Sequence, residues 1–513
     1  MNIRHNGGIL PWAALTFGLV LFYYQIFVIE PVNSDTANAM LVAQDLASGN
    51  WRLHGWFMAP DNFLGLDEVF YALIWRITHD TFLTLRLVPV LQWSGLALLA
   101  IFLATRSRFL FQSLFILSAT FLVPVFGPYT EHLYFQAPFH VLTTICMILA
   151  VMLCGRLCEA GRLDWLWTGI FAFIVIDAAF SDPFFQFILT GPLLLALWIC
   201  KPPSFRQIAL LYLVCVVCGM LLERLNILTG GFTQPATNIP ALASLSAIPG
   251  EIYRTALLWP VVLGCFPSGQ PLWLMILAGL RIPLILLLFV PVFQCALSFR
   301  KLEFTDLCLL LIVIANMCAV VFTNASADIS TARFFLPAWV CASILAAKFM
   351  RKHTAIAGYS LIISALALAV CVMKIGQFSE KSVRFLSQDG GYIAALETRG
   401  LTRGYAGYWQ ASDTTVATGG KIKVAAVILD QQGHLSAYDW FAKQSWYKGD
   451  AASTRFFVST SNDRGGPNPK AIIAMFGKPD DVFVVEGVKN QVTDPKTGEI
   501  ITYVYNRAQP SIR

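Results

Sequence analysis

Apolar segments long enough to cross a membrane recur from the N-terminus to about residue 374, and they limit what the chain can fold into. A transmembrane helix needs about 20 mostly apolar residues. Only 13% of the residues are charged, whereas soluble proteins carry about a quarter. The sequence therefore predicts a polytopic α-helical membrane protein with about eleven spans: 9–29, 82–104, 109–127, 139–155, 164–181, 183–200, 207–227, 281–299, 305–323, 334–350 and 354–374.

Positive charge alternates between successive loops and predicts the orientation of these spans. The richer set of loops holds Arg4, Arg106, Arg108, Arg156, Arg162, Lys201, Arg206, Arg300, Lys301, Lys348, Arg351 and Lys352. The opposite set holds little beyond Arg52, Arg254 and Arg333. Loops rich in lysine and arginine stay in the cytoplasm, which places the N-terminus inside and the C-terminal segment outside. The first span is long and has no small-residue cleavage site after it, so we expect it to be retained.

Most of the polar sequence falls on the outer side. The first outer loop, 30–81, carries two amphipathic stretches (33–49 and 67–79) that are expected to lie on the membrane surface. The apolar stretch 257–279 is broken by prolines and predicts surface or re-entrant helices, with a twelfth span as the alternative.

The C-terminal segment, 375–513, has the composition of a soluble α/β domain. The composition shifts to polar and β-branched residues, which predicts strands in 421–430, 454–460 and 481–487 and the end of a hairpin in 494–506. The segment 382–400 is expected to be helical. None of the 12 cysteines lies in this segment. We therefore expect the outer domain to fold without disulfides.

Several function classes are disfavoured by what the sequence lacks. It has no P-loop and no GxGxxG motif after a strand, which argues against a nucleotide-activated donor. The basic residues form no continuous stripe, so nucleic acid is not an expected partner. The spans lack the paired charges that mark ion pathways. The remaining polar signal is a group of outer acids and histidines: Asp35, Asp61, Asp67, Glu68, Glu131, Asp182, His54, His132 and His140.

Two motifs give the sequence a resemblance to a known family. A first span is followed by an acid and then by an amphipathic stretch ending in Gly-Asn, "NSDTANAMLVAQDLASGNW" (33–51). Near the end of a late span stands "TARFFLP" (331–337). This layout resembles the type C glycosyltransferases, membrane enzymes that use polyprenyl-phosphate sugars as donors. The segment "GYAGYWQASDTTVATGGKIKVAAV" (404–427) also resembles the soluble tail of bacterial proteins with this layout.

The resemblance implies a bacterial inner-membrane enzyme with a periplasmic site. Asp35 would be the general base that deprotonates an acceptor hydroxyl, with inversion at the sugar, and Arg333 would hold the donor phosphate. The acceptor would be an envelope glycan, a lipid or a protein. Many relatives have Asp-Glu where this chain has Asp35-Thr36, so a metal role requiring both carboxylates is in question. A divalent cation is one possible cofactor, with Glu131 and His132 as metal candidates. Further candidates for binding substrate, by position alone, are Arg254, Arg281, Asp67, His132 and Asp182.

Each of these residues also has a simpler interpretation. Asp35 or Ser34 could cap the helix that begins near Thr36. Arg333 could anchor its helix at the interface, and Asp182 lies in a turn sequence, "SDP". Two other functions also remain open: a transporter or flippase of a lipid-linked glycan, and a non-catalytic partner in envelope polysaccharide assembly.

Overall fold

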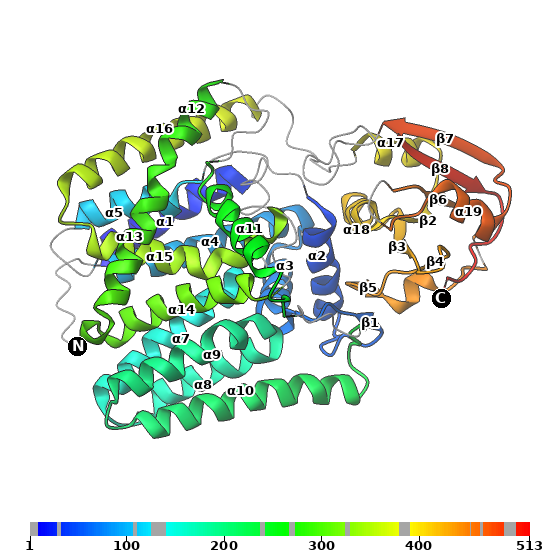
Figure 1. Ribbon diagram of the computed structural model, residues 1–513. Helices are drawn as coiled ribbons and strands as arrows, with labels where there is room; N and C mark the ends of the chain where they lie inside the picture. The colour runs from blue at the N-terminus through cyan, green and yellow to red at the C-terminus, as the bar shows by residue number, and fades with distance from the viewer. Residues whose placement is uncertain are drawn as a thin grey trace.

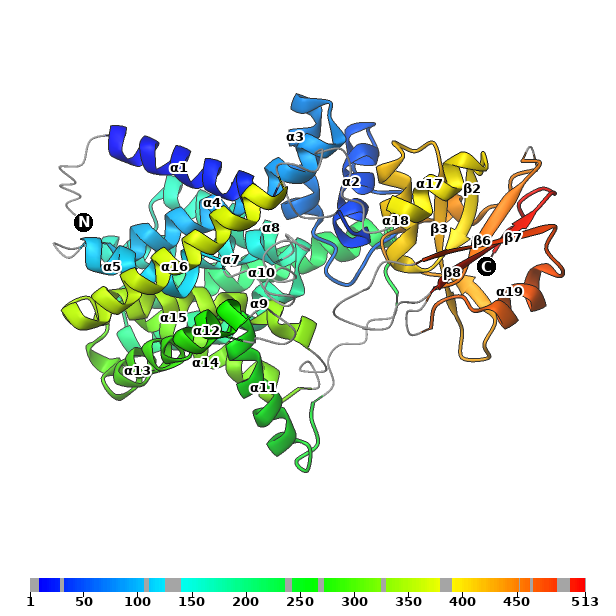
Figure 2. The same cartoon turned by 90° about the horizontal axis from the view of Figure 1, so that it is seen from above.

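The computed structural model describes residues 9–27, 32–105, 110–124, 140–235, 242–265, 272–323, 329–378, 390–451, 453–461, 465–486 and 499–512. Its long helices run side by side in one bundle, and a C-terminal sheet with its own helices lies at one end of that bundle (Figure 1). Seen from above, the first loop fills the space between the two parts (Figure 2). Segments from opposite ends of the chain therefore meet there.

The bundle contains the helices of a polytopic membrane protein. Within the described residues, eight helical segments are long and apolar enough to cross a membrane, and α1, α5 with η2, and α8 are shorter apolar helices. Each predicted span overlaps one of these segments. The helices are α1 (Ile9–Phe27), α4 (Thr81–Ala104), α5 (Leu110–Leu117) with the π-helical turn η2 (Ser118–Leu122), α7 (Val141–Ala160), α8 (Trp165–Ser181), α9 (Pro183–Cys200), α10 (Phe205–Leu228), α12 (Leu272–Arg281), α13 (Pro283–Leu297), α14 (Phe304–Val321), α15 (Leu336–Phe349) and α16 (Thr354–Phe378).

One apolar segment differs from its prediction. The span expected at 281–299 begins earlier, because α12 and α13 form one apolar run, Leu272–Leu297. Pro283 does not interrupt the run because proline is accepted in the first turn of a helix, and Ile282 keeps helical dihedral angles between the two helices. Part of the stretch expected at the surface thus belongs to a candidate span. The remainder forms α11 (Ile248–Val262) and residues outside the described ranges.

The first loop folds into α2 (Ser34–Ala47), the short strand β1 (Trp56–Phe57), the π-helical turn η1 (Leu64–Glu68) and α3 (Val69–Thr78). α2 is covered by other parts of the protein, which its sequence did not predict. Ten of its 14 residues are buried, because α3 packs on one side and α18 (Tyr408–Ala417) of the C-terminal domain on another. α3 keeps the expected exposed apolar face, with Leu73 and Ile77 open to the surroundings.

The C-terminal domain is built on a six-stranded mixed sheet in the order β4-β3-β2-β6-β8-β7. β2 runs parallel to β3 and β6, whereas the β3–β4, β6–β8 and β8–β7 pairs are antiparallel. The predicted terminal hairpin is confirmed as β7–β8. The strands are β2 (Arg403–Ala406), β3 (Lys423–Leu429), β4 (Leu435–Ala437), β6 (Phe456–Ser459), β7 (Asp481–Glu486) and β8 (Glu499–Tyr505).

Helices cover both faces of this sheet. Successive strand residues point to opposite faces, so Val424 and Phe457 pack with α17 (Gly390–Thr398) and α18, whereas Ala425 and Phe456 pack with α19 (Pro469–Phe476). The α18 side of the sheet faces the first loop (Figure 2). The fold of the domain thereby presents α18 to α2.

A second contact joins the two parts. β1 of the first loop pairs antiparallel with β5 (Ala442–Lys443) of the C-terminal domain, with Trp56 opposite Lys443. Lys443 Nζ also lies 2.7 Å from Asp45 Oδ1 near the end of α2. The C-terminal domain therefore contacts the first loop in two places. α18 packs against α2, and β5 with Lys443 binds β1 and the last turns of α2.

Candidate functional site

Asp35 stands in the first turn of α2, but it does not cap the helix. The cap is Asn33, whose side-chain oxygen accepts hydrogen bonds from the backbone N–H and the hydroxyl of Thr36, both at 3.0 Å. Ser34 is occupied elsewhere, because its hydroxyl donates to the Trp409 carbonyl at 2.9 Å. Neither alternative cap predicted from the sequence is present. The Asp35 carboxylate is consequently not committed to backbone N–H groups.

The Asp35 carboxylate accepts a hydrogen bond from the hydroxyl of Tyr408, at the start of α18. Burial raises the pKa of Asp35 above its ordinary value, although the charge of Arg333 and the bond from Tyr408 both act to lower it. A carboxylate whose pKa is raised toward neutrality is a stronger base than an exposed one. Asp35 remains partly exposed.

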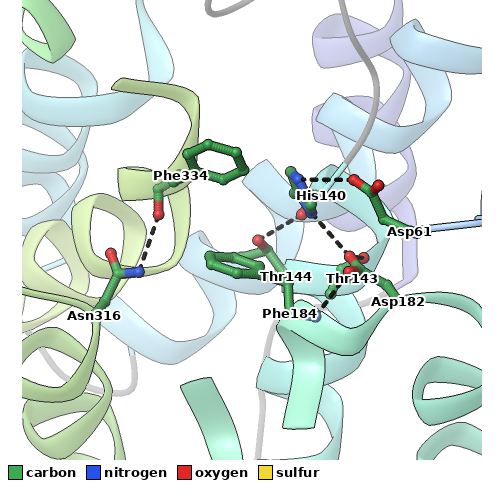
Figure 3. Close-up of polar contacts among 8 residues, drawn as sticks. All are labelled: Asp61, His140, Thr143, Thr144, Asp182, Phe184, Asn316 and Phe334. Atoms are coloured by element: carbon green, nitrogen blue, oxygen red, sulfur yellow. Dashed lines mark hydrogen bonds and ion pairs between the residues drawn. The ribbon is translucent and has the colours of Figure 1, made fainter. Parts of the chain in front are cut away.

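Arg333 belongs to the 3-10 segment η4 (Ile329–Phe335), just before α15. The backbone of η4 is held by Asn316 of α14, whose amide donates to the Phe334 carbonyl at 3.0 Å (Figure 3). The Arg333 side chain is exposed, and its guanidinium carbon lies 5.2 Å from the centre of the Phe334 ring. Its charge acts on Asp35, Asp61 and His140. The Arg333 cation is therefore within electrostatic range of two acids of the first loop and of His140.

His140 and Asp182 form the best-defined polar pair near this cation. His140 Nδ1 lies 2.8 Å from Asp182 Oδ2, and the Thr143 hydroxyl donates to the same oxygen at 2.6 Å (Figure 3). Asp182 also caps α9, since its other oxygen accepts from the Phe184 N–H at 2.9 Å. On its other side, His140 Nε2 faces Asp61 Oδ2 at 3.8 Å.

The pKa of His140 is raised. Burial alone would lower it, but the attraction of Asp182, the hydrogen bond to it and the charge of Asp61 together outweigh burial. The imidazole is enclosed by the rings of Phe63, Phe184 and Phe334, with centroids 4.8–5.5 Å from its own. The two carboxylates thus favour the protonated form of the His140 imidazole.

The other first-loop acids are mostly buried. Asp61 is 31% exposed, and burial raises its pKa to about 6. Asp67 and Glu68 are fully buried in η1. The Gln92 amide donates to Asp67 Oδ1 at 2.8 Å, while Asp67 Oδ2 and both Glu68 oxygens have no hydrogen-bond partner among the described residues. Burial raises the pKa of Asp67 to about 7 and that of Glu68 well above its ordinary value.

Some predicted site residues do not join this group. Arg281 does not face outward: it is 2% exposed, and its guanidinium donates to the carbonyls of Leu263 and Ala119. Arg254 pairs with Glu251, one turn earlier on α11. Asp67 is enclosed rather than presented at the surface. Glu131 and His132 lie outside the described residues, and within the residues that are described no group of three or more His, Cys, Asp or Glu is arranged to hold a metal ion.

Sequence reasoning missed Tyr408 and Asn33. Asn33 carries the usual signal of a helix cap, and it was overlooked because Ser34 and Asp35 carry the same signal. Tyr408 lies 373 residues from Asp35, and no local pattern relates the two. The comparisons add no relative: no protein-family model matches the chain, and no curated protein matches it either.

Proposed function

We propose that this membrane protein is a glycosyltransferase that takes a sugar from a polyprenyl-phosphate donor and passes it to an acceptor hydroxyl on the outer face. The observation that carries the proposal is the state of Asp35. Its carboxylate is free of helix capping, partly exposed, and under the influence of the Arg333 charge. A base within electrostatic range of a cation suits a reaction in which a hydroxyl loses a proton and a phosphate departs.

In this reaction the Asp35 carboxylate accepts the proton of the acceptor hydroxyl. The acceptor oxygen attacks the anomeric carbon from the face opposite the phosphate, and the bond between that carbon and the phosphate oxygen breaks with inversion. The electron pair leaves with the polyprenyl phosphate. Arg333 balances the charge on this leaving group, because the planar guanidinium can bind two phosphate oxygens at once.

The His140–Asp182 pair supports the site without taking part in the transfer. It connects the start of α7 to the start of α9, and it faces Asp61 of the first loop. Asn62, next to Asp61, donates to the Phe180 carbonyl and to Glu223 Oε1. The first loop is thereby fixed to α7, α8 and α10. A site placed on such a rigid support loses less catalytic power to misalignment.

The test is the isosteric variant Asp35→Asn, which keeps size and polarity but removes the base. With purified protein, polyprenyl-phosphate hexoses and pentoses as donors and envelope glycan extract as acceptor, release of polyprenyl phosphate is expected to fall by at least about 100-fold, because a positioned base contributes 10²–10⁴-fold. The matched control is Asp45→Asn on the same helix, which loses the ion pair with Lys443 and is expected to retain activity.

Two outcomes would contradict this assignment. Full activity of Asp35→Asn would remove Asp35 as the base. If the wild-type protein in vesicles moves a labelled lipid-linked glycan across the bilayer and leaves its chemistry unchanged, the transporter alternative replaces the enzyme. The acids Asp67 and Glu68, which the transfer does not use, would then be the first residues to examine.

A further inference from the structure

A directed chain of hydrogen bonds leads from the C-terminal domain to Asp35. The hydroxyl of Ser412 donates to Asn38 Oδ1. The amide of Asn38 donates to the Tyr408 hydroxyl oxygen at 3.0 Å, and Tyr408 donates to Asp35 Oδ1. Ser412 and Tyr408 belong to α18, whereas Asn38 and Asp35 belong to α2. The chain therefore crosses between the two parts of the molecule three times.

The chemistry of these groups fixes the direction of the chain. An ionised carboxylate only accepts, so the single Tyr408 proton must point to Asp35. The amide of Asn38 is then the group that donates to the tyrosine oxygen, and Ser412 holds the amide in that orientation by donating to its carbonyl oxygen. Within the part of the chain that the structure describes, Asp35 Oδ2 accepts no hydrogen bond. One carboxylate oxygen is thus held, and the other is left available.

The tyrosine itself is firmly placed. Its ring packs edge-on against Trp409 and Tyr438, with centroids 5.1 and 5.2 Å away. The Trp409 carbonyl is tied to Ser34, the residue before Asp35. The hydroxyl consequently has little freedom to leave the carboxylate.

We propose that Tyr408 is a positioning residue for the Asp35 carboxylate, so that the active site is complete only when the C-terminal domain is docked on the first loop. This inference rests on the proposed glycosyltransferase function. In it, Tyr408 holds Oδ1 and thereby directs Oδ2 toward the acceptor hydroxyl. The C-terminal domain then contributes to catalysis through the orientation of the Asp35 carboxylate.

The test is Tyr408→Phe, which removes only the hydroxyl. The probe is the labelled polyprenyl-phosphate sugar that gives the highest turnover with the wild-type protein. The charged and titratable groups acting on Asp35 are Arg333 of η4 and Tyr408 of α18, and both lower its pKa. Loss of the hydroxyl raises that pKa, so the acid limb of the kcat/KM profile is expected to move to higher pH. At pH values on the acid side of this limb, the transfer rate is expected to fall about tenfold or more relative to wild type. The KM for the donor is expected to stay unchanged.

Two further variants separate positioning from general damage to the interface. Lys443→Met removes a contact between the same two parts, near the far end of α2, and is expected to leave the acid limb in place. Ser412→Ala releases the Asn38 amide and is expected to shift the limb in the same direction as Tyr408→Phe, but less. It also serves as the second test if Tyr408→Phe does not fold.

The outcomes distinguish this inference from the proposed function. If Asp35→Asn is inactive while Tyr408→Phe and Ser412→Ala keep the wild-type pH profile, Tyr408 has no positioning role and the enzyme assignment stands. If Lys443→Met shifts the limb as much as Tyr408→Phe, the effect belongs to domain docking in general, and the specific role of the hydroxyl is overturned. If Asp35→Asn is fully active, both proposals fail.

Discussion

At the scale of single residues, the Asp182 carboxylate takes part in three hydrogen bonds near the candidate site. This carboxylate has no exposed surface, and its partners are the His140 imidazole, the Thr143 hydroxyl and the Phe184 N–H. His140 has a φ of +68°, in the left-handed region that non-glycine residues rarely adopt. A strained residue persists only where its surroundings hold it. The hydrogen bond to Asp182 is one of the contacts that do so.

Asp182→Ala is therefore expected to be strongly destabilising. Removing one partner of a buried ion pair costs about 3–5 kcal/mol, measured as a fall in the unfolding free energy or the melting temperature in detergent. The matched control is Asp164→Ala, a cap of α8 that accepts from the Leu166 and Trp167 N–H groups without an ion pair. That variant is expected to cost only about 1 kcal/mol. Equal losses in the two variants would contradict an ion-pair role for Asp182.

The pH dependence of that loss gives a second check. The folded protein raises the pKa of His140 above its ordinary value of 6.5. The stability gained from the charged pair is therefore fully present below pH 6.5 and is lost as the pH rises through the folded pKa. The difference in stability between wild type and Asp182→Ala is expected to shrink at alkaline pH.

At the scale of elements, the π-helical turn η1 packs directly onto α8. The Gly65 N–H donates to the Ser181 hydroxyl at 2.9 Å. A Cβ at Gly65 would lie 2.0 Å from Asp177 Oδ1 and 2.7 Å from the Ser181 hydroxyl oxygen. The absence of a side chain at this position therefore allows η1 to carry Asp67 and Glu68 into the interior.

Gly65→Ala is expected to displace η1 and to destabilise the protein by about 1–3 kcal/mol, the usual cost of overpacking. Gly169→Ala on α8 is the control, because a Cβ there meets nothing within 4 Å and alanine favours the helix. Thermal unfolding of both variants in the same detergent provides the comparison. If Gly65→Ala is as stable as Gly169→Ala, the close approach of η1 and α8 is not important for stability.

The sequence predicts elements well where the signal is local. Apolar length located the helices of the bundle, and short runs rich in β-branched and aromatic residues located β3, β6 and the β7–β8 hairpin. Contacts between distant segments were not predictable in this way. The apolar face of α2 indicates that the helix is amphipathic, but only its contact with α18 explains why its polar residues, such as Asn38, are buried as well.

The candidate site shows the same limit. Asp35 and Arg333 were chosen from short motifs, and the structure brings their charges within interaction range. Arg281 was chosen by position alone, and position along the chain does not reveal which way a side chain turns. Its guanidinium satisfies two buried backbone carbonyls, a need that arises only after the helices have packed.

At the scale of the whole molecule, the contact between the first loop and the C-terminal domain constrains how the chain crosses the membrane. Two segments that bind each other must lie on the same side of it. The number of crossings between α3 and α17 is therefore even. The eight long candidate spans satisfy this condition, and they still do if the shorter α5–η2 segment and α8 are both added. Adding only one of the two would separate the domain from the loop.

The contacts of His140 favour the arrangement in which both shorter segments cross. His140 precedes α7 and faces Asp61 of the first loop, and Asp182 at the end of α8 contacts His140. The start of α7 and the end of α8 therefore lie beside the first loop, where Figure 3 shows His140 between Asp61 and Asp182. α4 crosses the membrane away from the side of the first loop, whereas α7 starts on that side. The segment between them, α5 with η2, must therefore cross the membrane in the opposite direction. With α1, this arrangement gives eleven crossings among the described residues, and it predicts that the turn between α7 and α8 lies on the opposite side of the membrane from the C-terminal domain.

Cysteine labelling in a background without the exposed Cys200 and Cys318 tests this arrangement. Gln432→Cys, in the exposed turn between β3 and β4, is expected to react with a membrane-impermeant maleimide in intact spheroplasts. Arg162→Cys, exposed between α7 and α8, is expected to react only after permeabilisation, because positive charge marks the cytoplasmic side. If the cysteine at 162 reacts in intact spheroplasts as fast as the one at 432, then α5 with η2 and α8 do not cross. The number of crossings between α3 and α17 would then be eight, which is still even, and the arrangement in which both shorter segments cross would be overturned.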